Sequence, residues 1–177
     1  MLEPHERQAL LQLARQAIAA RLEGRPVDTP QASGGLAQRT GAFVTIRHHD
    51  RLRGCIGSVE RADTLVTVVA QCAGDAATED PRFPPLPLDV LPEVVLEISV
   101  LGPVEPVADP AAVEVGRHGL VVEHGAHRGL LLPQVPTEWG WDRETFLSQT
   151  CVKAGLSADA WQTGARLFTF EAYVFGE

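Results

Sequence analysis

The chain has 177 residues, 45% hydrophobic and 21% charged, a composition typical of a globular protein with one core or two small lobes. Its formal net charge of −8 excludes a general nucleic-acid binder, because such proteins carry a basic stripe that neutralises phosphates. We expect no membrane span, since no apolar run approaches the roughly 20 residues required. The charged N-terminal residues do not resemble a signal peptide, and the three cysteines lack CxxC spacing, so we expect a cytoplasmic protein.

The first half of the chain predicts, in order, a helix, a loop, the two arms of a hairpin, a second helix and a strand. These elements cover residues 5–23, 25–35, 41–47, 52–59, 64–77 and 94–101. Apolar residues recur at helical spacing in both helices. Gly24 is a natural end for the first helix, and Asp63 and Thr64 are candidate N-caps for the second.

The second half repeats the order of hairpin, helix and strand. The corresponding elements cover residues 119–123, 128–132, 143–154 and 167–175. Arg53-Gly54 in the first hairpin corresponds to Arg128-Gly129 in the second, at an offset of about 75 to 80 residues. We therefore predict an α+β fold in which two duplicated units share a sheet with helices outside. The alternative is that two ordinary hairpins fall in this order by chance.

The run Arg51–Ser58, with the sequence Arg-Leu-Arg-Gly-Cys-Ile-Gly-Ser, is the first candidate for a functional site. Glycine in a strand adds no packing, so two glycines beside one cysteine indicate a bulge, a bend or the close approach of another group. Cys55 is a candidate nucleophile or thiol acid/base, and His48, across the hairpin turn, is a candidate general base. The alternative is that Cys55 is a buried structural cysteine.

Arg53 is the candidate for binding an anion. Its guanidinium, together with the N–H groups of Gly54 and Gly57, suits a carboxylate or a phosphate. The alternative is an internal ion pair, for which the candidate partners are Asp80, Glu60 and Glu97.

The segment 80–87 contains four prolines and is predicted to be extended and stiff. Asp80 and Arg82 are therefore candidates for a preorganised binding rim. The alternative is a stiff crossover in which Phe83 enters the core and Asp80 or Arg82 bonds to the backbone. In the apolar run 129–134, Gln134 is the one polar group with functional potential.

No metal site and no cofactor are predicted from sequence motifs. None of the six histidines belongs to an HExxH motif or a Cys/His finger. The chain also lacks a phosphate loop, a GxGxxG run after a strand and a GxSxG elbow.

Together these motifs resemble the AMMECR-one family, whose bacterial and archaeal members are called AmmeMemoRadiSam system protein A. The resemblance runs nearly end to end, in the family's order, through residues 41–45, 52–57, 80–85, 97–101, 129–135, 141–142 and 153–156. It implies an α+β fold with a duplicated hairpin–helix–strand unit and a single barrel-like, mainly antiparallel sheet with helices outside. The chain is then one domain over residues 1–177, or two interlocked lobes over about 36–105 and 106–177, with the N-terminal helix 5–23.

The family resemblance implies partners more clearly than chemistry, because the family has no settled reaction. Prokaryotic members are often encoded beside a Memo-like protein, which resembles non-haem iron dioxygenases, and a radical SAM enzyme. One hypothesis is an enzyme or enzyme subunit of that pathway, which binds a small anionic molecule at the Arg-Gly-Cys-Ile-Gly strand. The other is a non-catalytic adaptor that docks those two partners.

Overall fold

The computed structural model describes residues 2–59 and 62–177, and the chain divides into two compact units. The first unit comprises Met1–Leu101 with Tyr173–Glu177, and the second comprises Gly102–Ala172. The boundary falls within the last strand, β7 (Arg166–Gly176), so this strand contributes residues to both units. Within the described ranges, no helix has the length and apolar character needed to cross a membrane.

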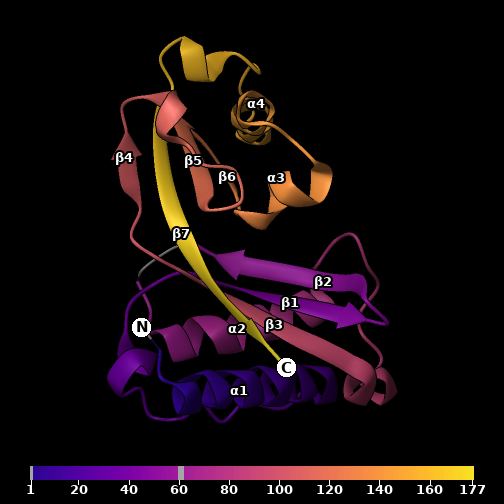
Figure 1. Cartoon of the computed structure of the whole chain (residues 1–177). Helices are drawn as coiled ribbons and strands as arrows, with labels where there is room; N and C mark the ends of the chain where they lie inside the picture. The colour runs from indigo at the N-terminus through magenta and orange to yellow at the C-terminus, as the bar shows by residue number, and fades with distance from the viewer. Residues whose placement is uncertain (1, 60–61) are drawn as a thin grey trace. The chain divides into compact units, whose positions relative to one another are not determined.

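The first unit is a small antiparallel sheet with its helices on one face (Figure 1). Its elements are α1 (Pro4–Glu23), η1 (Gly34–Ala37), β1 (Ala42–His48), β2 (Arg51–Ser58), α2 (Leu65–Thr78), η2 (Leu88–Glu93) and β3 (Val94–Leu101). Strands β1 and β2 form the predicted hairpin, and β3 pairs with the other edge of β1. Strand β2 is therefore at the edge of this sheet.

The two faces of this sheet differ because successive side chains of a strand point to opposite sides. On β1, Ala42, Val44 and Ile46 are buried in the core formed with α1 and α2. The alternate residues, Phe43 and Thr45, therefore lie on the face opposite the helices. That second face is the one that carries Cys55, since Cys55 is the register partner of Thr45.

The second unit has its own antiparallel strands, in the order β6-β5-β7-β4. Its elements before β7 are β4 (Glu105–Val107), η3 (Pro110–Ala112), β5 (His118–His124), β6 (His127–Leu131), α3 (Gln134–Trp139), α4 (Arg143–Lys153) and η4 (Ala160–Gln162). Helix α4 packs on the β5–β6 hairpin and buries Phe146, Leu147 and Cys151. Asp142 caps α4 as predicted, because its Oδ1 accepts the N–H of Thr145 at 2.8 Å.

The repeated order of hairpin, helix and strand is present in both units, and it explains the paired Arg-Gly dipeptides. A Cβ atom at Gly54 would lie 2.0 Å from the backbone oxygen of Ala76, in α2. A Cβ atom at Gly129 would lie 2.5 Å from the backbone nitrogen of Ala154, which ends α4. Each second hairpin arm thus needs glycine where the last turn of the following helix crosses it.

The predicted α+β class and the mainly antiparallel sheet are confirmed. All strand pairs described are antiparallel, and hydrogen-bonded neighbours follow one path, β2-β1-β3-β7-β5-β6, with β4 also on β7.

Among the described strands and α-helices, two elements were not predicted, and neither were the short 3-10 helices η1, η2 and η3. Strand β4 has only three residues, one of them Pro106, and helix α3 follows Pro133 and contains Pro136. Prolines in the first turn of a helix are tolerated, because the first N–H groups have no partner within the helix.

Candidate functional site

Cys55 lies in a row of polar side chains that crosses the sheet of the first unit. It is half-buried on β2, opposite Thr45 on β1, which in turn is opposite Glu97 on β3. The Oγ1 of Thr45 donates a hydrogen bond to the Cys55 Sγ at 3.3 Å. The strand register therefore places a thiol, a hydroxyl and a carboxylate side by side on the face opposite the helices.

The surroundings of Cys55 keep its thiol protonated at neutral pH. Burial raises the pKa of Cys55 above its ordinary value, and the negative charges of Asp80 and Glu97 raise it further. The hydrogen bond from Thr45 and the positive charge of Arg82 lower the pKa but do not offset the burial. Cys55 is therefore a neutral hydrogen-bonding group at neutral pH, since a nucleophilic cysteine requires the thiolate.

Asp80 anchors the proline-rich segment to the free edge of β2. Its buried carboxylate accepts the backbone N–H of Cys55 at 2.9 Å and the backbone N–H of Arg82 at 3.1 Å. The guanidinium of Arg82 binds the same carboxylate through Nε at 3.0 Å and Nη2 at 2.7 Å. This pairing with Arg82 holds the pKa of Asp80 down to about 2. The two side chains neutralise each other. They therefore fit the interpretation of residues 80–87 as a stiff structural crossover better than the interpretation as a rim that binds a ligand.

Arg53 is the extra residue of a β-bulge. Ile46 pairs with Gly54 and Arg47 with Leu52, which leaves Arg53 without a register partner. Its Nη2 donates to the Pro85 carbonyl at 3.2 Å.

Most N–H groups of the Arg53 guanidinium make no hydrogen bond to the residues that the structure describes. It lies 5.8 Å from the centre of the Phe83 ring, and the guanidinium of Arg82 lies 5.5 Å from the same centre. Among the residues that the structure describes, no carboxylate is within ion-pair distance of Arg53. Of the predicted partners, Asp80 is taken by Arg82, Glu97 forms no ion pair with Arg53, and Glu60 is outside the described residues.

Packing accounts for both glycines of the motif. Gly54 admits the carbonyl of Ala76, and Gly57 lies under the ring of Phe43, which a Cβ would approach to 2.2 Å. The glycines were predicted to mark a bulge, a bend or the close approach of another group, and the bulge at Arg53 and these two close contacts confirm that prediction. The approaching groups are a helix carbonyl and an aromatic ring; the role of the glycine N–H groups in anion binding stays a prediction.

His48 does not lie beside Cys55. It is two residues after Ile46 on β1 and so faces the side of the helices, whereas Cys55 faces the other side. Its Nε2 lies 3.2 Å from the Glu93 Oε2. The prediction that His48 acts as a general base to Cys55 is therefore wrong, because the two side chains lie on opposite faces of the sheet. Gln134, the remaining predicted binding residue, begins α3 in the second unit.

Phe83, expected in the core in one interpretation, is only half-buried and lies within cation–π distance of two arginines, and Leu86 is the buried residue of that segment. Two further side chains were not singled out from the sequence. Thr45 and Ser99 are buried on the face that carries Cys55, and within the described part of the chain the Ser99 Oγ has no hydrogen-bond partner. Strand alternation would have revealed both, once the pairing of β1 with β2 and β3 was known.

A hollow of about 180 Å³ adjoins the motif between β2 and α2. Gly57 and Cys72 line it, together with the carboxylates of Asp63 and Asp75. Burial raises the pKa of Cys72 to about 11, so this thiol is also protonated at neutral pH. Asp75 is paired with Arg21 at 2.7 Å, and neither the Arg53 guanidinium nor another cationic side chain is among the described lining residues, so the hollow does not suit an anion.

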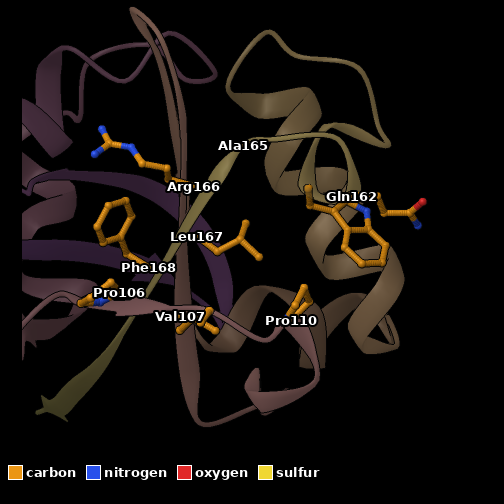
Figure 2. A pocket seen from close by; sticks show the side chains of 10 residues that line it. Pro106, Val107, Pro110, Gln162, Ala165, Arg166, Leu167 and Phe168 are labelled. Atoms are coloured by element: carbon orange, nitrogen blue, oxygen red, sulfur yellow. The ribbon is translucent and has the colours of Figure 1, made fainter.

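A larger hollow, of about 670 Å³, lies within the second unit (Figure 2). Apolar side chains of β4, β7 and η4 form most of its wall, among them Val107, Leu167 and Trp161. Its one charged group, Arg166, is held by Glu123 at 2.9 Å. This hollow therefore offers apolar contact but no unpaired charge.

Comparison with known proteins gives consistent results over nearly the whole chain. The sequence model of the AMMECR1 family matches residues 11–175. This is the family written above as AMMECR-one. A protein of Methanothermobacter thermautotrophicus is 45% identical, over 97% of this chain and 94% of the relative. A protein of Thermococcus onnurineus is 44% identical, over 95% of this chain and 88% of the relative. A crystal structure of an uncharacterised Pyrococcus horikoshii protein aligns with a TM-score of 0.88 and 41% identity, over 96% of this chain and 90% of that one.

Proposed function

This chain belongs to the AMMECR1 family, and from that premise we propose that its first unit binds a small anionic molecule at the Arg53 guanidinium. One observation carries the proposal: within the described residues, Arg53 is not paired with a carboxylate, although it is half-buried. The hydrogen bond from its guanidinium to the Pro85 carbonyl is exposed, so the other N–H donors face solvent where an anion can reach them. A carboxylate or phosphate that binds through two oxygens matches the planar fork of arginine.

The neighbouring contacts supply a rigid setting for such a ligand. The Phe83 ring lies 5.8 Å from the guanidinium of Arg53 and 5.5 Å from that of Arg82, and the Pro85 carbonyl accepts a hydrogen bond from Arg53. Asp80 compensates the charge of Arg82 only, so the cluster of the two arginines with Asp80 has an excess of one positive charge. An anion is therefore the ligand that the charge of this cluster favours.

We assign Cys55 as a neutral contact or hydrogen-bond donor to that anion. Because burial raises the pKa of its thiol, the group enters the complex with its proton in place. This assignment keeps the thiol of Cys55 as a hydrogen-bond donor and omits both the nucleophile and the transfer of its proton, because the burial that raises its pKa disfavours the thiolate. As an enzyme or enzyme subunit, the chain would use this thiol to orient the bound molecule.

Titration calorimetry with inorganic phosphate and with succinate, added separately to the full chain, tests the proposal. We expect one of these probes to bind, and Arg53→Gln to weaken its binding at least tenfold, because a charge-assisted hydrogen bond contributes about 1.5 to 3 kcal/mol. Arg51→Gln is the matched control, since Arg51 is an exposed arginine on the same strand. Binding unaffected by Arg53→Gln, or an equal loss in both variants, would refute the proposal.

The adaptor function is a second candidate, favoured by an exposed tryptophan in the second unit. Trp139 is 71% exposed and stacks on Trp141 with ring centres 6.2 Å apart. Exposed aromatic side chains of this kind are common anchors of protein interfaces. We propose the Memo-like protein and the radical SAM enzyme of the family's pathway as the partners. Pull-down with the purified partners should weaken with Trp139→Ala and not with Val152→Ala, a control at another exposed apolar residue.

A further inference from the structure

Two histidines and a glutamate converge at the end of the β1–β2 hairpin. The Nε2 of His48 lies 3.2 Å from the Oε2 of Glu93, and the Nε2 of His49 lies 3.7 Å from the same oxygen. One ligating atom from each of the three side chains lies within 4.8 Å of the others. We propose that His48, His49 and Glu93 form a binding site for a divalent transition-metal ion, with zinc as the best match.

The hairpin and its pairing with β3 bring these three side chains together. His48 ends β1 and pairs with Val94 on β3, so Glu93, the residue before Val94, arrives beside it. His49 and Asp50 form the turn, with positive φ values of 48° and 60°. This left-handed turn folds the His49 ring back against His48, with ring centres 4.0 Å apart.

The ligand types and spacing fit zinc. Zinc binds imidazole nitrogen and carboxylate oxygen at about 2.0 to 2.2 Å in tetrahedral geometry, which separates neighbouring ligand atoms by about 3.3 Å. The two nitrogen–oxygen distances of 3.2 and 3.7 Å are close to that separation. Two imidazoles also favour zinc, copper or nickel over magnesium and calcium, which prefer oxygen ligands.

Exposure makes the site accessible and leaves room for a further ligand. The side chain of His49 is 75% exposed and that of Glu93 is 57% exposed, while His48 is 27% exposed. Three protein ligands leave the fourth tetrahedral position to water or to another molecule. Sequence motifs gave no indication of this site, because Glu93 is distant in the chain from the two histidines.

Titration calorimetry of the metal-free full chain with zinc chloride tests the inference. We expect one zinc ion per chain, and a loss of affinity of at least tenfold in each of His48→Ala, His49→Ala and Glu93→Gln. The control is the double variant His124→Ala and His127→Ala, which removes the paired histidines at the hairpin end of the second unit. Circular dichroism would verify that every variant is folded.

Two results would overturn the proposed zinc site. An absence of zinc binding by the folded native chain would overturn the site and leave the cluster as two histidine–glutamate contacts at the end of the hairpin. Binding that survives the Glu93 and His48 variants but is lost in the control would place the ion at the other hairpin, and would also overturn the inference. Neither result bears on anion binding at Arg53, which uses different residues and a different probe.

Discussion

Replacement of Asp80 by asparagine should destabilise the first unit, and the effect should depend on pH. The Asp80 side chain is only 3% exposed and accepts four hydrogen bonds, two from backbone N–H groups and two from the Arg82 guanidinium. Asp80→Asn keeps the shape and one acceptor oxygen but removes the charge that binds Arg82.

The magnitude follows from the pKa of Asp80. The ordinary value is 3.8 and the folded protein holds it at about 2. Each pKa unit corresponds to about 1.4 kcal/mol, so the charged form of Asp80 contributes about 2 kcal/mol to the free energy of unfolding. Because the pKa is lowered by folding, this contribution is fully present above about pH 4. It is lost as the pH falls towards 2.

Urea unfolding of the native protein and of Asp80→Asn at pH 7, 4 and 2.5 measures this contribution. We expect a difference of about 2 kcal/mol at pH 7 that persists at pH 4 and shrinks towards zero at pH 2.5. Asp89→Asn is the control, since Asp89 is an exposed aspartate of the same unit and should change stability by less than about 0.5 kcal/mol. A difference at pH 7 no larger than that of the control, or a difference independent of pH, would contradict the assigned role of Asp80.

Three further predictions concern the motif strand, the thiol and a helix cap. Gly54→Ala should lower the free energy of unfolding by about 3 kcal/mol, since its Cβ would meet the carbonyl of Ala76; an unchanged melting temperature would rule out that contact. Iodoacetamide should label the native protein slowly at pH 7 and faster above pH 9, at Cys55 only, because the other two cysteines are buried. Rapid labelling at neutral pH that is lost in Cys55→Ser would disprove the raised pKa of Cys55. Asp142→Ala should cost about 1 kcal/mol in urea unfolding, because the Thr145 N–H loses its acceptor, and equal stability would argue against the cap.

Most of the secondary structure was predictable because its signals are local. The spacing of apolar residues located α1, α2 and α4, and strand β3 has the predicted bounds. The strand and the α-helix that were missed, β4 and α3, are short and contain proline, so their apolar pattern spans too few residues to be recognised.

The candidate site was predictable only in part. Sequence proximity suggested that His48 reaches Cys55, but the two-residue period of the strand sends these side chains to opposite faces of the sheet. The motif glycines correctly indicated a bulge and a close approach, but not that a helix carbonyl approaches Gly54 and an aromatic ring approaches Gly57. These assignments depend on what lies across the strand, which local patterns do not specify.

Composition, hydrophobic periodicity and the repeated Arg-Gly pattern were sufficient for the α+β class, the duplicated unit and the strand that holds Cys55, since each depends on neighbours along the chain. Tertiary structure alone decided which groups far apart in the chain meet: the Asp80 carboxylate binds the backbone N–H of Cys55, and Glu93 joins the histidines of the hairpin turn. The physical reason is that electrostatic and metal-binding groups act over a few ångströms in space. Only strand register and loop closure determine which residues come that close.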